Sequence, residues 1–180
     1  MKKEHLALAA VVAALPALSH AQKSTYTIGA TVGYYFPSDS TIRKAMGSDI
    51  FIWGIQPLTF GRPKSNAIGL NINVIGADQN GSNFLLVPVT LGYEYHFGDT
   101  NSTTVPYARL DVGGAFMNYS IATSGATISG SRIGGVAGAE LGVEIQKNWR
   151  LSARYYVFTK ENNLSFNGVQ LTLSFGVIHL

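Results

Sequence analysis

The sequence predicts an all-β protein, an eight-stranded antiparallel up-and-down transmembrane β-barrel. Three observations predict this fold. An export signal precedes a chain that contains no apolar run long enough for a membrane-spanning helix. Eight later segments alternate apolar and polar residues with a period of two. Finally, only 13% of the 180 residues are charged, against about 25% in an average protein, so part of the surface is expected to face something other than water.

The export signal is predicted over residues 1–21. Two lysines follow the first Met, residues 6–18 are almost entirely apolar, and Ser19 and Ala21 place small side chains at the positions that a signal peptidase reads. Cleavage after Ala21 leaves residues 22–180 as one outer-membrane barrel domain. The chain has no cysteine, which excludes a disulfide framework and a thiolate metal site.

The first two strands are predicted over 25–36 and 50–60. Along 25–36 one face carries Tyr, Ile, Ala, Val, Tyr and Phe, and the other carries mainly Thr and Gly. Along 50–60 Phe, Trp and Ile alternate with small or polar residues, and Pro57 weakens the pattern in the second half. Between these strands, residues 40–46 show the only competing helical pattern, a short turn of helix.

The third and fourth strands are predicted over 68–74 and 84–97. In the third, Ile, Leu, Ile and Val alternate with Gly and Asn. In the fourth, seven apolar or aromatic residues from Leu85 to Phe97 face away from Thr, Gly, Glu and His. Both segments end in clusters of turn-forming residues.

The last four strands are predicted over 107–118, 131–146, 149–157 and 169–177. In each of them, one face carries aliphatic or aromatic side chains, and the other face carries Gly, Ser, Thr, Gln, Arg, Asp and Glu. A short Gln-Lys-Asn turn separates the sixth from the seventh. Because transmembrane barrels have short periplasmic turns, this turn and the N-terminus are placed on the periplasmic side. The loops then expected outside the cell are 38–47, 77–83, 120–130 and 160–165.

Aromatic residues near the strand ends favour a lipid-facing rather than a soluble barrel, because membrane barrels carry an aromatic girdle at each interface. The girdle expected at the periplasmic end consists of Tyr26, Phe60, Tyr95, Phe97, Trp149 and Phe175. The girdle expected at the outer end consists of Tyr34, Phe36, Phe51, Trp53, Phe84, Phe116 and Tyr155.

The polar face is expected to line the lumen. It carries arginines and carboxylates in nearly equal number, and no lysine. Inside a narrow barrel such charges are expected to pair, and the planar guanidinium suits that pairing. The predicted network, structural or pore-lining, lies in the periplasmic half and consists of Glu94, His96, Arg109, Asp111, Glu140, Glu144, Arg150 and Arg154.

Ten glycines share the polar face. Since an eight-stranded barrel has an interior just wide enough for side chains, we expect the missing Cβ atoms to leave room for bulky neighbours. These glycines are Gly29, Gly33, Gly54, Gly69, Gly92, Gly113, Gly134, Gly138, Gly142 and Gly176.

The chain resembles the small eight-stranded outer-membrane barrels of the OmpA membrane domain and OmpX-like group. The resemblance rests on the export signal, on LGVEIQKNWRLSARYYVF at 141–158 and on the closing strand FNGVQLTLSFGVIHL at 166–180. It implies a location in the outer membrane of a Gram-negative cell envelope. It also implies contact with outer-membrane lipid and lipopolysaccharide, and insertion by the barrel assembly machinery.

The functional expectation is a structural or surface-interaction role for a monomeric barrel whose lumen the charged network closes. Three alternatives remain: a narrow gated pore for small solutes or ions, a lipid A-modifying enzyme, and a soluble periplasmic barrel that binds an apolar ligand. The sequence lacks HExxH, GxSxG and phosphate-loop motifs, so we expect no catalytic residue, no metal, no cofactor and no nucleic-acid partner.

Overall fold

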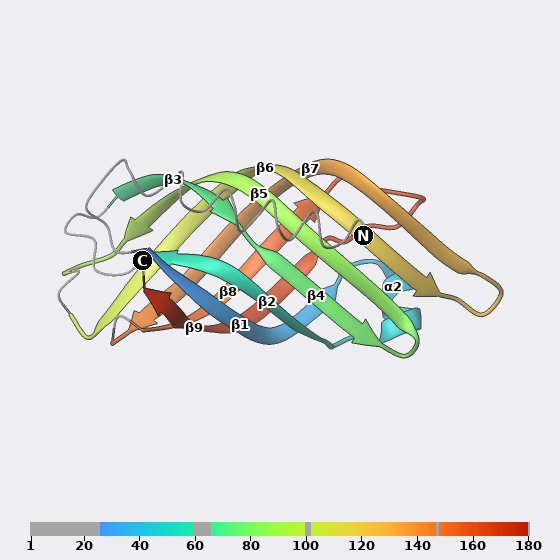
Figure 1. Ribbon diagram of the computed structural model, residues 1–180, viewed down its shortest axis with the longest axis horizontal. Helices are drawn as coiled ribbons and strands as arrows, with labels where there is room; N and C mark the ends of the chain where they lie inside the picture. The colour runs from blue at the N-terminus through green and yellow to red at the C-terminus, as the bar shows by residue number, and fades with distance from the viewer. Residues whose placement is uncertain (1–25, 60–65, 100–101, 147, 180) are drawn as a thin grey trace.

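A computed structural model describes residues 26–59, 66–99, 102–146 and 148–179 (Figure 1). The predicted export signal lies outside the described residues. Within the described part of the chain, no helix has the length and hydropathy needed to cross a membrane.

The described residues form nine strands and one short helix, which runs over Ser40–Met46 and is labelled α2. The strands are β1 (Tyr26–Pro37), β2 (Ile50–Thr59), β3 (Asn66–Ile72), β4 (Val74–Gln79), β5 (Ser82–His96), β6 (Thr104–Ala122), β7 (Thr127–Ile145), β8 (Trp149–Phe158) and β9 (Gly168–His179).

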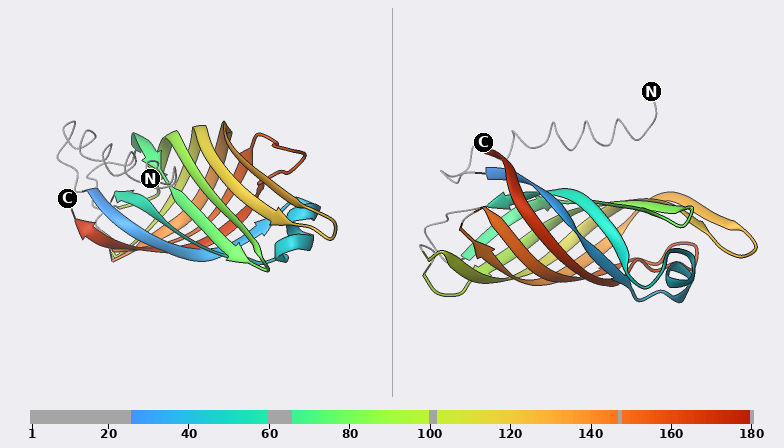
Figure 2. Two further views of the ribbon diagram at one scale, coloured as in Figure 1. Left: turned by 45° about the vertical axis from the view of Figure 1, so that its right-hand side comes forward. Right: turned by 90° about the horizontal axis from the view of Figure 1, so that it is seen from below.

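Eight of the strands close into an antiparallel ring, which confirms the predicted barrel. The order β5-β4-β2-β1-β9-β8-β7-β6 returns to its start through the β5–β6 ladder. All of these pairings are antiparallel. Figure 2 shows the resulting tilted, tubular wall from two further directions.

The ninth strand arises because the predicted third strand is interrupted and is longer than its pattern indicated. Both β3 and β4 pair with β5 in one register: Ile72 lies opposite Val89, and Ile75 lies opposite Leu86. At the break, the backbone N–H of Asn73 donates to the Pro88 carbonyl at 3.0 Å. Pro88 has no N–H with which to continue the ladder. Strands β3 and β4 are therefore two parts of one segment.

The loop predicted over 77–83 is wrong. Strand β4 continues to Gln79 and β5 begins at Ser82, so only Asn80 and Gly81 connect them. Both residues have positive φ, 52° and 73°. Asn-Gly tolerates that conformation well and favours a two-residue hairpin turn.

The loop predicted over 120–130 is also wrong. Strand β6 runs to Ala122 and β7 begins at Thr127, and Ser120 still pairs with Ser129. The Ser, Thr and Gly residues of this segment form a polar hairpin that continues past the barrel rim, at the right of Figure 1.

Helix α2 confirms the predicted helical turn between the first two strands. The Asp39 carboxylate caps it by accepting hydrogen bonds from the amides of Thr41 (2.7 Å) and Ile42 (3.3 Å). Its second oxygen accepts from the Ser165 amide at 2.9 Å. Asp39 therefore joins the first and last outer loops. Ile42 and Met46 of the helix are fully buried.

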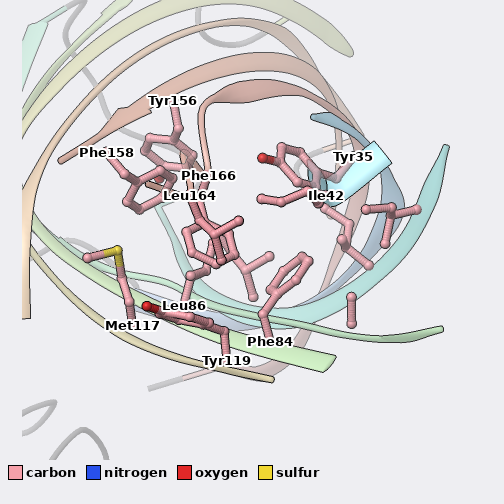
Figure 3. Packing of buried hydrophobic residues seen from close by; sticks show 14 of the residues in the cluster. Tyr35, Ile42, Phe84, Leu86, Met117, Tyr119, Tyr156, Phe158, Leu164 and Phe166 are labelled. Atoms are coloured by element: carbon pink, nitrogen blue, oxygen red, sulfur yellow. The ribbon is translucent and has the colours of Figure 1, made fainter. Parts of the chain in front are cut away.

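An apolar cluster packs inside the barrel wall, at the end of the barrel that carries α2, and Figure 3 shows how its side chains lie against one another. Helix α2 and the loop after β8 contribute to it, together with lumen-facing side chains of the strands. Its members are Tyr35, Ile42, Met46, Ile50, Ile52, Ile75, Ala77, Phe84, Leu86, Ala115, Met117, Tyr119, Ile121, Val136, Tyr156, Phe158, Leu164 and Phe166. We call this set the apolar plug.

Phe84 corrects the predicted outer girdle. Its side chain is 3% exposed and packs edge-on against Tyr35 and Phe166 inside the plug. It lies on the lumen side because it shares the parity of Thr90 and Glu94 on β5, not that of Leu85.

The lipid-facing surface of the wall carries many exposed apolar side chains, as expected for contact with lipid. Near the periplasmic end Tyr95 and Phe97 pack edge to face, and Trp149 packs against Phe175. Toward the other end Tyr34, Phe51 and Trp53 are about half exposed (49%, 49% and 52%). The girdle residues Tyr26 and Phe60 are not among those whose side chains the structure describes.

Candidate functional site

All eight residues of the predicted network are buried, none more than 8% exposed. Four of them form one register row across consecutive strands. Glu94 of β5 lies opposite Arg109 of β6, which lies opposite Glu140 of β7, which lies opposite Arg154 of β8. Since neighbours in a row share a face, the ladder itself places charges of alternating sign side by side.

Arg150 links two carboxylates, Glu94 of this row and Glu144, which lies next to the row on its predicted periplasmic side. It donates to both oxygens of Glu94, at 3.1 and 3.0 Å, and also to Glu144. Its guanidinium also lies over the Tyr107 ring, 4.6 Å from the centroid. His96 Nε2 lies 3.3 Å from a carboxylate oxygen of both Glu94 and Glu144. Each charge here has a partner of opposite sign, as burial requires.

Arg109 and Asp111 form a second part of the network. Arg109 Nε donates to Asp111 Oδ1 at 2.9 Å, and Arg109 Nη1 lies 3.8 Å from Glu94. The same Asp111 oxygen accepts from Asn71 at 3.2 Å and from Thr90 at 3.3 Å.

Arg154 and Glu140 form the third part, next to the plug. Arg154 Nε donates to Glu140 Oε2 at 2.8 Å, and its Nη2 contacts the same oxygen. Tyr107 donates to the other Glu140 oxygen at 2.7 Å. Arg154 Nη1 and Asn73 Nδ2 both donate to the Tyr156 hydroxyl, each at 2.8 Å. Tyr156 also belongs to the plug, so it connects the charged part of the lumen with the apolar part.

The composition of the network bears on what it can bind. Glu94, His96 and Glu144 offer ligand atoms within 4.8 Å of one another, a spacing that can hold a metal ion. Arg150, however, already contacts both carboxylates. A guanidinium therefore stands where a metal ion would have to bind, and the donor set fits an ion-pair network better than a metal centre.

His96 is not placed for lipid chemistry. Its side chain lies inside the barrel, between Glu94 and Glu144 and beside the Tyr107 ring, with centroids 5.9 Å apart. A residue that acts on membrane lipid has to reach the lipid-facing or outer side of the wall.

The lumen glycines act in two ways. At Gly92, Gly138 and Gly142 an added Cβ would lie 2.3 to 2.7 Å from an Asp111, Tyr156 or Tyr107 side-chain atom, which confirms the predicted role of leaving room. At Gly33, Gly54 and Gly113 the close neighbour is instead the backbone of the adjacent strand, at 2.0, 1.7 and 2.2 Å.

Sequence reasoning missed the uncharged partners of the network and the apolar plug. Tyr107, Tyr156 and Asn73 hold the charged groups in position, and Phe84 and Leu86 share the polar parity of β5. The sequence does contain a pattern that indicates the plug. Toward the outer strand ends, bulky apolar residues occupy lumen positions, which indicates that the lumen lining changes from polar to apolar along the barrel.

An eight-stranded antiparallel barrel with an apolar outer wall and polar residues facing the lumen is the architecture of the small outer-membrane barrels. Residues 5–176 match the family model of the outer membrane protein beta-barrel domain. The chain belongs to this family and is a protein of the outer membrane. A comparison with curated proteins finds no match.

Solved structures share the fold. The N-terminal β-barrel domain of Pseudomonas aeruginosa OprF is 17% identical, with a TM-score of 0.54 over 87% of this chain and 98% of that one. Neisserial surface protein A is 14% identical, with a TM-score of 0.52 over 87% and 98%. The outer membrane enzyme PagL is 14% identical, with a TM-score of 0.53 over 83% and 99%. At these identities the likeness concerns the fold alone.

Proposed function

We propose that this protein is a monomeric, closed barrel that works through the surface it presents outside the cell. The observation that carries the proposal is the filling of the lumen at two levels. Ion pairs between β5, β6, β7 and β8 lie in the predicted periplasmic half, and the apolar plug packs in the outer half beneath α2. A water file would have to displace both a buried ion-pair network and a packed aromatic cluster. The proposal therefore favours surface interaction over the gated-pore alternative.

The projecting β6–β7 hairpin is the element best suited to such an interaction. Ladder pairing of β7 with β8 begins only at Val136, and Thr159 bonds to the Gly135 backbone. Over 127–134, no strand among the described residues pairs with the edge of β7 that faces away from β6. This edge carries one charged residue, Arg132, and no proline, so it has few of the features that block strand addition.

An extended segment of a partner protein can add to such an edge through backbone hydrogen bonds. Side chains along this part of β7 are small or polar apart from Ile128 and Ile133, and Ile133 is 77% exposed. We propose that strand addition at this edge is how the barrel binds a partner, after the assembly machinery has inserted it.

A pair of matched double variants tests this. Ser129→Lys/Ser131→Lys places two lysines on the free edge, where lysine opposes strand pairing. Asn118→Lys/Ser120→Lys places the same charges on the directly opposite residues of β6, which already pair with β5. Both variants are checked for folding by the gel shift between boiled and unboiled samples.

Gram-negative cells that display each variant are compared for adherence to cultured epithelial cells and to cells of their own strain. We expect adherence above that of empty cells for the wild type and the β6 variant, and loss for the β7 variant. Equal adherence of the two variants, or none above empty cells on either surface, would contradict the proposal.

A further inference from the structure

A small cavity lies where the ladder between β2 and β4 ends. Among the described residues this ladder has three residue pairs, and the last of them joins Ile55 to Val74. Asn73, the residue before Val74, lines the cavity. Lumen-facing side chains of β8 and β9 line it from the other side, among them Arg154 and Gln170. The cavity therefore lies between the end of one ladder and the polar residues of the lumen.

Asn73 brings an unsatisfied hydrogen-bond acceptor to this cavity. The residue is buried, with 3% of its surface exposed. Its Nδ2 donates to the Tyr156 hydroxyl at 2.8 Å, but its Oδ1 has no hydrogen-bond partner among the described residues. Buried polar atoms in folded proteins are almost always paired, with protein groups or with ordered water. The free oxygen therefore indicates a ligand that donates a hydrogen bond.

Size and charge restrict what that ligand can be. The cavity has a volume of about 20 Å³, and a polar cavity of about 10 to 15 Å³ already holds one water molecule. The Arg154 guanidinium lines the cavity and repels a cation. All three nitrogens of Arg154 already donate to Glu140 or Tyr156, and the free atom of the cavity is an acceptor, so an anion fits no better.

We infer that this cavity binds one ordered water molecule, which donates a hydrogen bond to Asn73 Oδ1. Gln170 and Thr172 of β9 also line the cavity, and both are buried (4% and 8% exposed). Their amide and hydroxyl groups can donate to a water or accept from it. A buried water typically makes about three hydrogen bonds, and these three side chains supply that number.

The water joins two separate sets of hydrogen bonds inside the barrel. Through the Tyr156 hydroxyl, Asn73 belongs to the same set as Arg154 and the ion pairs. Thr172 shares a hydrogen bond of 2.9 Å with Ser152, across β8 and β9. The water therefore extends the hydrogen-bonded network of the lumen from the ion pairs to β9. The site lies away from the β7 edge and does not depend on strand addition there.

Removing two of the three water ligands tests the inference. The double variant Gln170→Met/Thr172→Val keeps side chains of similar size and takes away the amide and the hydroxyl. Thr90→Val is the matched control, because Thr90 is a buried threonine that bonds to Asp111 and does not line the cavity. The gel shift between boiled and unboiled samples reports whether each variant folds.

Crystals of the protein are grown from a lipidic phase that contains rubidium bromide, and diffraction is measured at the absorption edges of both ions. We expect the wild type and Thr90→Val to show a density peak within hydrogen-bond distance of Asn73 Oδ1, without an anomalous signal. In the double variant we expect this peak to fall by about fivefold or more, since one ligand cannot hold a water.

Three results would overturn the inference: no peak in the wild type, an anomalous signal that identifies the occupant as an ion, or an undiminished peak in the double variant. If the double variant does not fold, the wild-type density alone decides. Adherence of cells is measured separately from this density, so the water site and the function proposed above can fail independently.

Discussion

Replacing Arg154 with Met tests how much a buried ion pair of the lumen network contributes to the free energy of unfolding. Arg154 pairs with Glu140 at 2.8 Å, and both side chains are almost completely enclosed (6% and 1% exposed). Arg154→Met leaves the Glu140 carboxylate buried without its cation, which typically costs about 3 to 5 kcal/mol. The free energy of unfolding is measured by urea titration in lipid vesicles, with the gel shift on boiling as the readout.

The exposed pair Arg132–Glu161 provides the control. Its atoms are also 2.8 Å apart, but the Arg132 side chain is 66% exposed. Arg132→Met should therefore cost only about 0 to 1 kcal/mol. In the double variant Arg154→Met/Glu140→Gln the amide can still accept from Tyr107 and no charge is stranded, so we expect roughly half or more of the loss to be recovered. Similar costs for Arg154→Met and Arg132→Met, or no recovery in the double variant, would refute the reasoning.

Three other outcomes follow from the structure. Gly92→Ala should destabilise by about 1 to 3 kcal/mol in the same titration, because its Cβ would lie 2.3 Å from Asp111 Oδ1, whereas Gly125→Ala, in open space, should be nearly neutral. Asp39→Ala removes the α2 cap and the bond to Ser165, so it should cost about 0.5 to 2 kcal/mol and speed amide exchange in both outer loops; unchanged exchange would contradict the link. Mass spectra of lipid A from cells with and without the protein should be identical, and a new lipid A species would restore the enzyme alternative.

The barrel was predictable because alternation fixes which face of each strand is apolar, and a closed ring is the one way for strands to cross a membrane. The network members could be named for the same reason: Glu94, Arg109, Glu140 and Arg154 share the lumen parity of their strands. Their pairing partners were not predictable. Arg150 bonds Glu94 from three strands away, and such contacts depend on barrel closure and stagger.

The errors arose where a local signal competed with pairing. Residues 77–79, 120–122 and 127–130 lie in mostly polar stretches that resemble loops, yet ladder partners on β5 and within the hairpin hold them as strands. Phe84 is aromatic and near a strand end, and these two features alone predict a place at the lipid interface. Its parity places it in the lumen, and packing with Tyr35 and Phe166 keeps it there.

The central claim is that the lumen is closed, and single-channel recording in planar bilayers tests it most directly. We expect no stable conductance steps from the wild-type barrel, because the ion-pair network and the apolar plug both lie in the path. Stable wild-type steps whose size changes in Arg154→Ala would show instead that the network lines an open pore.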